Sequence, residues 1–159
     1  MPERHFGLAK GEDLAALSGL DFLRAMMAGE QPSPLMSQTL GFRLAAIEEG
    51  MAVFEGEPSP ALLNPLGAVH GGWALALVDS ACGCAVHATL PAGVGYTTVE
   101  TKVNFTRAIA PDRGTVRCEG RVVTRGRRIA TAEARLLSAE GKILAHGTST
   151  LMILEQRPG

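Results

Sequence analysis

The sequence predicts an α+β fold in which an antiparallel sheet wraps around one long central helix. The first observation is a segment, residues 73–90, that is apolar nearly all around a helix, as is typical of a helix enclosed by a sheet. The second is a change of period after Gly95, where helical spacing gives way to the alternation of strands. The chain of 159 residues, 46% of them hydrophobic, suits one globular domain with a well-filled core.

Helical and strand patterns precede the central helix. Apolar residues at helical spacing over 12–28, with a break at Ser18-Gly19, predict one helix or two short ones. Prolines within 32–34 end this helical region. Two strands that meet in a hairpin turn at 49–50 are then expected over 41–48 and 51–57.

The central helix is expected over 70–90, after a proline-bounded loop over 58–67, and Pro91 and Gly93 end it. The alternation in the next strand predicts one apolar face, formed by Thr97, Val99, Thr101, Val103 and Phe105. We expect this strand and three more to form a four-strand meander over 95–105, 114–124, 127–138 and 142–154.

Charge and composition exclude several functional classes. With 15 basic and 16 acidic residues, the balance does not favour binding to nucleic acid or to an anionic membrane. Residues 1–10 lack the apolar core of a signal peptide, and no run approaches the ~20 apolar residues of a membrane span. We therefore expect a cytoplasmic protein, with its three cysteines as buried thiols in a reducing compartment: Cys82, Cys84 and Cys118.

Metal binding is not expected. No Cys/His cluster has the spacing of zinc ligands, and the four histidines are scattered at positions 5, 70, 87 and 146. We expect no metal and no redox cofactor.

Asp79 is the only acidic residue in the apolar segment 73–90. An unpaired buried carboxylate costs several kcal/mol, so this side chain is either partnered or functional. On a helix it shares a face with Gly72, Ala76 and Gly83, whose small side chains leave a groove beside it. The alternatives are a structural anchor beneath a closely packed element and a catalytic carboxylate.

The start of the helix is a second candidate site. Free backbone N–H groups around Gly71 and Gly72 suit an oxygen that gains negative charge, as in acyl transfer. Gly71 and Asp79 are eight residues apart, which is ~12 Å along one helix, so one carbonyl cannot contact both. If both act on one substrate, the carboxylate comes from a second copy, and the active unit is at least a two-fold dimer.

The motif spacing resembles that of a known enzyme family. Asn64, His70-Gly71-Gly72, Asp79-Ser80 and a long strand ending at 102–105 are similar to the hotdog-fold acyl-CoA thioesterases of the phenylacetate-pathway (PaaI-like) branch. The resemblance covers roughly residues 41–154 and implies a hotdog thioesterase domain over 37–155, preceded by an N-terminal helical extension over 1–36. It also implies hydrolysis of an acyl-CoA substrate by dimers with two sites at the interface, often assembled into tetramers.

The resemblance also implies residue roles. The Gly71 N–H polarises the thioester carbonyl, Asp79 of the other subunit is the nucleophile or general base, and Asn64 helps to place the carbonyl or the water. His70 supports the loop or lines the site, although a histidine at a helix start is also a common cap. The remaining expected substrate-binding residues are Gly72, Ser80, Gly83 and Glu100.

Coenzyme A contacts in the family fall on strand ends and on the turn before the fifth strand. In this chain that turn falls at 124–128. The planar guanidinium groups of its arginines suit phosphate oxygens, and Gly126 permits a tight turn. The alternative is a solvated basic turn that protects a sheet edge. The expected CoA-binding residues are Thr124, Arg125, Gly126, Arg127 and Arg128, with Arg107 on a neighbouring strand end.

Other functions on the same fold stay open. A hotdog hydratase or dehydratase would pair an acidic residue with a histidine in a different motif, which this chain does not show. An acyl-CoA-binding sensor would keep the arginine turn without needing Asp79. Residues 1–34 either cap the dimer or cover the acyl channel, and the small side chains near Asp79 leave room for an aryl or medium-length acyl group.

Overall fold

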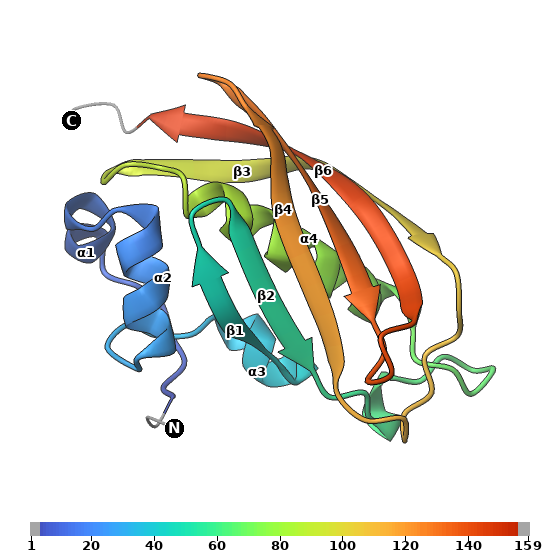
Figure 1. The fold of residues 1–159 in the computed structure, drawn as a ribbon. Coiled ribbons are helices and arrows are strands. Elements are labelled where there is room, and N and C mark those ends of the chain that lie inside the picture. Colours follow the sequence, from blue (N-terminus) through green and yellow to red (C-terminus); the bar gives the residue numbers. More distant parts are fainter. Residues whose placement is uncertain (1–3, 156–159) are drawn as a thin grey trace.

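The computed structural model describes residues 4–155, in which a six-stranded antiparallel sheet curves around one long helix, α4 (Gly71–His87) (Figure 1). Residues 1–3 of the predicted extension lie outside the described residues. The helices before α4 are α1 (Gly11–Ala16), α2 (Gly19–Met27), α3 (Leu35–Leu40) and the short 3-10 helix η1 (Pro60–Leu62). The strands are β1 (Phe42–Glu48), β2 (Met51–Gly56), β3 (Val94–Phe105), β4 (Val116–Arg125), β5 (Ile129–Leu137) and β6 (Ile143–Glu155).

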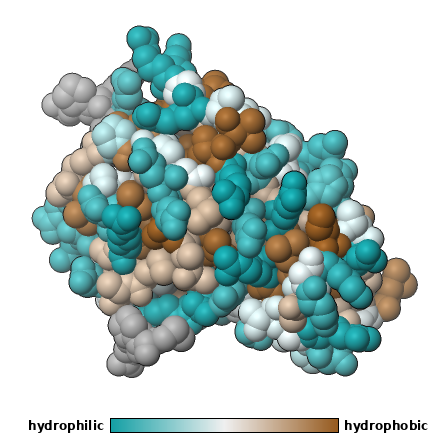
Figure 2. Space-filling model, viewed as in Figure 1, coloured by the Kyte–Doolittle hydropathy of each residue, from teal (hydrophilic) through white to brown (hydrophobic). Residues whose placement is uncertain are grey.

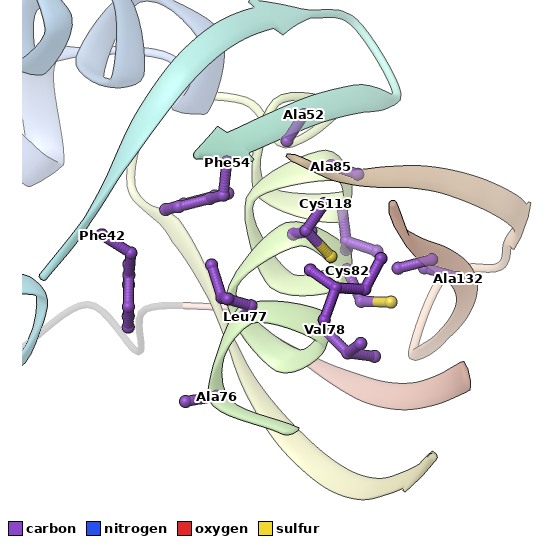
Figure 3. Packing of buried hydrophobic residues seen from close by; sticks show 14 of the residues in the cluster. Phe42, Ala52, Phe54, Ala76, Leu77, Val78, Cys82, Ala85, Cys118 and Ala132 are labelled. Carbon is purple, nitrogen blue, oxygen red and sulfur yellow. The ribbon is translucent and has the colours of Figure 1, made fainter. Parts of the chain in front are cut away.

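α4 forms the centre of the hydrophobic core, as its composition predicts. The side chains of Leu77, Val78, Cys82 and Val86 are fully buried against the concave face of the sheet. Figure 3 shows Phe42 and Phe54, from β1 and β2, on one side of this helix. The α+β fold with one enclosed helix is therefore confirmed.

The outer face of the sheet is solvated and mixed in polarity. Figure 2 shows apolar side chains scattered among hydrophilic ones on this side of the molecule. Val123, Ile129 and Met152 are among the exposed apolar residues. β4, β5 and β6 thus separate core from solvent by alternation.

Gly120 on β4 lets α4 lie unusually close to the sheet. A Cβ atom built on this glycine would lie 2.4 Å from the Ala81 carbonyl oxygen, a backbone atom of α4. Neither a strand paired on both sides nor a helix backbone can move easily to relieve that overlap. A residue without a side chain is therefore required at this contact.

Replacing Gly120 by alanine should destabilise the fold by about 3 kcal/mol, since overpacking against backbone forces α4 away from β4. Urea denaturation at matched protein concentration measures the effect. Gly95→Ala is the control, because a Cβ there meets nothing within 4 Å and should change the free energy of unfolding by less than ~0.5 kcal/mol. Equal stabilities of the two variants would contradict the close approach.

The strand order differs from the predicted meander. The order is β1-β2-β4-β5-β6-β3, so β4, β5 and β6 are consecutive neighbours, but β3 crosses over and pairs with β6. β4 instead pairs with β2 of the amino-terminal hairpin. The expected β3–β4 pairing is wrong because alternation specifies which face of a strand is buried, while the partner depends on which sheet edge is free in the folded chain.

A β-bulge in β3 corrects the predicted apolar face. The register with β6 shifts between Thr98 and Glu100, and Val99 at the shift is 57% exposed. One extra residue reverses the alternation, so Thr98 and Thr101 both face α4 although they are three residues apart. Phe105, also expected on the apolar face, is 57% exposed.

The amino-terminal segment folds into three helices, of which α3 is not predicted by the sequence pattern. The break at Ser18-Gly19 separates α1 from α2, and the Ser18 hydroxyl caps α2 by accepting from the Asp21 N–H at 3.1 Å. α3 follows Pro34 and ends at Gly41, whose φ of 66° is left-handed. The predicted boundary at 36/37 falls inside this short helix.

These helices pack on the core. Phe22, Leu23 and Met26 of α2 belong to the same buried cluster as α4. The Gly19 N–H donates to the Leu90 carbonyl at 3.0 Å, and the Trp73 indole N–H donates to the Leu40 carbonyl at 2.7 Å. α2 is thereby tied to the end of α4, and α3 to its beginning.

Candidate active site

Asp79 lies midway along α4, half-buried, with its carboxylate held by β3. The Thr98 hydroxyl donates to Oδ1 at 3.0 Å and the Thr101 hydroxyl donates to the same oxygen at 2.9 Å. The Thr101 and Ser149 hydroxyls are 2.9 Å apart, which extends the network to β6. No hydrogen bond from the described residues reaches Oδ2. One oxygen is therefore anchored, and the other is left for chemistry.

The sequence pattern misses this support. In a regular strand, residues three apart face opposite sides, so Thr98 and Thr101 cannot both be assigned to one carboxylate. Only the bulge brings them together. The available signal, two threonines in a long strand, is too common to identify them.

A cavity of about 430 Å³ opens beside Asp79. It lies between the amino-terminal helices, β1 and α4, and Ser80 and Cys84 line it from the helix. Its apolar lining comprises Met26, Met27, Met36, Phe42, Leu44 and Phe54. Such a volume is within the usual range of small-molecule sites, which are mostly apolar with a few polar groups.

The other nucleophilic groups at the cavity stay protonated at neutral pH. Burial, followed by the nearby charge of Asp79, raises the pKa of the Cys84 thiol to about 12. Burial also raises the pKa of the Tyr96 phenol above its usual range. A protonated thiol and phenol are weak nucleophiles, so the Asp79 carboxylate is the reactive candidate at this site.

The start of α4 offers fewer free donors than expected. The His70 Nδ1 accepts from the Gly72 N–H at 2.9 Å, so this N–H is used for capping. The expectation that both glycine N–H groups are free is thus wrong for Gly72. The Gly71 N–H has no acceptor among the described residues. The Phe105 ring packs beside this glycine, since a Cβ on Gly71 would lie 3.0 Å from it.

Asn64 shapes the loop that leads to α4. Its Oδ1 accepts from the Leu66 N–H at 2.9 Å and from the Ala68 N–H at 3.2 Å. This arrangement closes a tight turn on the backbone, as asparagine side chains commonly do. The structure assigns the carbonyl oxygen to the loop, which leaves the side-chain amide N–H₂ as the part that can meet a ligand.

The remaining predicted substrate-binding residues are spread around Asp79. Ser80 lines the cavity. Gly83 faces the Tyr96 hydroxyl, which would lie 2.6 Å from a Cβ there, so an aromatic ring fills the groove expected beside this glycine. Glu100 is exposed, and its Oε2 accepts from the Thr150 hydroxyl at 3.4 Å. Glu100 is adjacent to Thr101, which faces Asp79, so alternation along β3 directs Glu100 away from Asp79.

The predicted CoA-binding arginines are not all together within one chain. Arg125 and Arg127 flank a hollow with Pro91 and Val94, and the Gly126 N–H closes the turn by donating to the Ile129 carbonyl at 2.8 Å. The Thr124 hydroxyl lies 2.9 Å from that of Thr131 on β5. These residues form the β4–β5 turn, near the end of α4 (Figure 1).

Arg107 lies beside the start of β6, whereas the β4–β5 turn lies beside its end. The Arg107 N–H donates to the Leu144 carbonyl, while the Arg128 carbonyl accepts from the Ile153 N–H. Leu144 and Ile153 are nine positions apart along β6, a distance of ~30 Å. The expectation that Arg107 lies on a strand end beside the β4–β5 turn is wrong. β3 runs antiparallel to β6, so β3 ends beside the start of β6, far from that turn.

Residues 4–155 contain no group of three or more His, Cys, Asp or Glu side chains positioned to hold a metal ion. None of the helices in this part of the chain has the length and hydropathy required to cross a bilayer.

Comparison with known proteins identifies the family. The family model described as "Thioesterase superfamily" matches residues 66–145. A phenylacetic acid degradation-related protein from Ralstonia eutropha JMP134 is 32% identical, with 82% of this chain and 98% of that one covered and a TM-score of 0.75. A thioesterase family protein from Silicibacter pomeroyi is 27% identical, with 87% and 99% covered and a TM-score of 0.74.

A third protein has the same fold. The Streptococcus mutans UA159 protein smu.793, bound to acetyl CoA, is 24% identical, with 74% of this chain and 92% of that one covered and a TM-score of 0.66. No curated protein matches the sequence. The fold, the family model and the Ralstonia eutropha relative agree with the resemblance seen in the motifs. The chain therefore belongs to the thioesterase superfamily, the hotdog-fold enzymes that hydrolyse thioesters.

Proposed function

We propose that this chain hydrolyses an acyl-CoA to a free acid and CoA, with Asp79 of one subunit and the Gly71 N–H of a second copy acting on the same thioester. The observation that carries the proposal is the Asp79 carboxylate, anchored through Oδ1 by two threonine hydroxyls and open at Oδ2 beside an apolar cavity. A fixed carboxylate next to a hydrophobic pocket is suited to attack on an acyl group.

The chemistry balances by either of two routes. As a general base, Asp79 takes a proton from water while the water oxygen bonds to the thioester carbon; the C–S bond then breaks and the proton passes to the CoA sulfur. As a nucleophile, Oδ2 itself bonds to that carbon and expels CoA as a thiolate; water then hydrolyses the resulting anhydride to the free acid and the Asp79 carboxylate, and the proton released passes to the CoA sulfur. In both routes the Gly71 N–H donates to the carbonyl oxygen as it becomes negative.

A second copy is required because of the length of α4. Gly71 and Asp79 lie on one straight helix, ~12 Å apart, whereas a carbonyl carbon and its oxygen are adjacent atoms. An antiparallel α4 from a two-fold partner would bring the two residues together and create two equivalent sites. β3 supports such a partner, because it occupies a sheet edge and exposes Val99 and Phe105.

The CoA portion supplies phosphates that the arginine turn is suited to bind. Arg125 and Arg127 flank one hollow, and guanidinium groups bind phosphate oxygens in pairs. The acetyl CoA bound by smu.793, a protein of the same fold, supports a CoA thioester as the substrate.

Replacing Arg125 and Arg127 by alanine should raise KM at least ~10-fold for acyl-CoA and much less for the matching acyl-pantetheine thioester, which lacks the nucleotide phosphates. Thiol release measures both substrates. The matched control replaces Arg121 and Arg135, two exposed arginines of the same sheet, and should leave both KM values unchanged. An equal rise in KM for the two substrates would reject the role of these arginines in phosphate binding.

The same assay tests the function as a whole. Thiol release from a panel of acyl-CoAs is expected for the wild type. Binding of acyl-CoA with no release of CoA would instead favour the sensor, and addition of water across a double bond in an enoyl-CoA would favour the hydratase.

A further inference from the structure

We propose that the cavity beside Asp79 is the acyl-binding pocket for an unbranched aliphatic chain, and that α2 and α3 form the wall that limits the chain's length. This inference rests on the proposed hydrolysis of acyl-CoA and deepens it by naming the substrate class. It also assigns the amino-terminal helices a direct part in the specificity of the enzyme.

The cavity extends from Asp79 to the amino-terminal segment. Asp79 and Ser80 lie on one wall, and Met26, Met27 and Met36 belong to the amino-terminal segment on the other. A thioester whose carbonyl carbon lies at Asp79 therefore directs its acyl chain toward α2. The subunit that supplies the carboxylate also supplies the acyl pocket.

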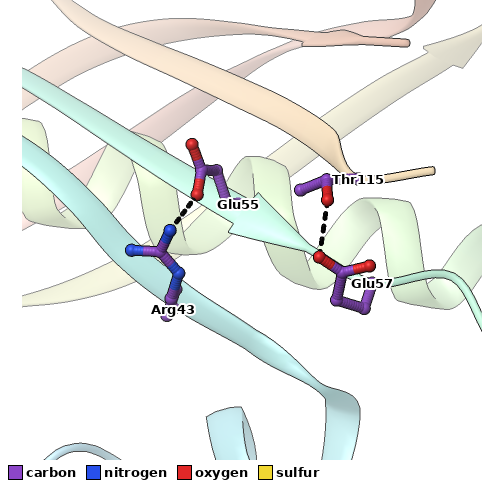
Figure 4. A network of polar contacts seen from close by, with 4 residues as sticks. All are labelled: Arg43, Glu55, Glu57 and Thr115. Atoms are coloured by element: carbon purple, nitrogen blue, oxygen red, sulfur yellow. Dashed lines mark hydrogen bonds and ion pairs between the residues drawn. The ribbon is translucent and has the colours of Figure 1, made fainter. Parts of the chain in front are cut away.

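The chemistry of the lining favours an acyl chain without polar substituents. Two polar side chains of the wall are already engaged: the Ser37 hydroxyl donates to the Pro34 carbonyl at 2.6 Å, and Arg43 forms an ion pair with Glu55 on β2 (Figure 4). A hydroxyl or carboxylate on the acyl chain would find these partners occupied. An unsubstituted hydrocarbon requires none, and unbranched methionine side chains adapt to a flexible chain.

The volume of the cavity suits an acyl chain of medium length. The volume of about 430 Å³ is within the range of pockets that enclose a small organic ligand. An acyl chain of about ten carbons is therefore of suitable size for this cavity.

The wall is anchored, so it can set a limit. The Gly19 N–H holds the start of α2 to Leu90, and the Trp73 indole holds the end of α3. The connection between these helices is also fixed, because the Ser33 carbonyl accepts from the Gly7 N–H at 3.0 Å. A chain that exceeds the cavity therefore meets packed backbone rather than a loose segment.

The experiment measures kcat/KM over straight acyl-CoAs from four to sixteen carbons and for phenylacetyl-CoA. Met27→Trp, which narrows the cavity, should reduce the ratio of decanoyl-CoA to butanoyl-CoA at least ~10-fold, in line with the cost of removing space for a few methylenes. Met27→Ala should shift the preferred length upward. Met152→Trp is the control on the outer face, where Met152 is 42% exposed, and should leave the profile unchanged.

Each result decides one claim. Opposite shifts for the two Met27 variants support the wall, and an unchanged profile in both, with folding verified by circular dichroism, overturns it. Phenylacetyl-CoA turned over faster than every straight chain would overturn the substrate class. If no acyl-CoA is hydrolysed, the proposed function fails, and calorimetry still tests the cavity: decanoate should bind to the wild type and lose at least ~10-fold in affinity with Met27→Trp.

Discussion

Asp79→Asn is expected to lower kcat on acyl-CoA at least ~10²-fold while the protein stays folded and associated. The asparagine carbonyl oxygen can still accept from Thr98 and Thr101, so the network of β3 is preserved. Its amide nitrogen, in the place of Oδ2, can neither take a proton from water nor attack a carbonyl. Steady-state thiol release measures the loss, and Glu133→Gln, the same kind of change on an exposed residue of β5, should have no effect.

The structural alternative for Asp79 makes a different prediction. An anchor beneath β3 would lose stability on substitution, with kcat reduced only in proportion to the unfolded fraction. Thermal denaturation and kcat measured on the same variant separate the two roles. Turnover close to that of the wild type in a folded Asp79→Asn protein would remove this carboxylate from the mechanism.

Mixed dimers of Asp79→Asn and Gly71→Pro are expected to recover up to about half of the wild-type activity, although each parent dimer is nearly inactive. Proline removes the backbone donor at the first position of a helix, where its ring is tolerated. The preceding His70 is already extended, with ψ of 134°, as a residue before proline requires. In the mixed dimer one site carries both changes and the other carries neither.

Gly71→Ala is the matched control for the proline. Both substitutions add a Cβ atom, which meets the Phe105 ring at 3.0 Å, but alanine keeps the N–H. Activity retained by Gly71→Ala and lost by Gly71→Pro assigns the effect to the donor. Verified mixed dimers without activity, formed from two folded variants, would show that Gly71 and Asp79 do not serve one thioester across subunits.

Elements with a strong local pattern are predictable from this sequence. The apolar composition of 70–90 predicts an enclosed helix, and α4 is one. The hairpin of β1 and β2 turns at Glu49-Gly50 as expected, with Gly50 at a φ of 74°. Asp79 is identifiable because a lone carboxylate in an apolar helix conflicts with its surroundings.

Contacts between distant segments required the folded chain. The pairing of β3 with β6, the separation of Arg107 from the β4–β5 turn, and the cavity beneath α2 and α3 depend on which surfaces meet after collapse. Thr98 and Thr101 show the reason most clearly, since one bulged residue turns both hydroxyls toward Asp79. Periodicity depends only on residues that are close in sequence. The sequence by itself therefore determined the helices with strong periodicity, the strands and the lone carboxylate. Register, strand partners and cavities are set by the competition of all segments for the same core, and the tertiary structure alone decides them.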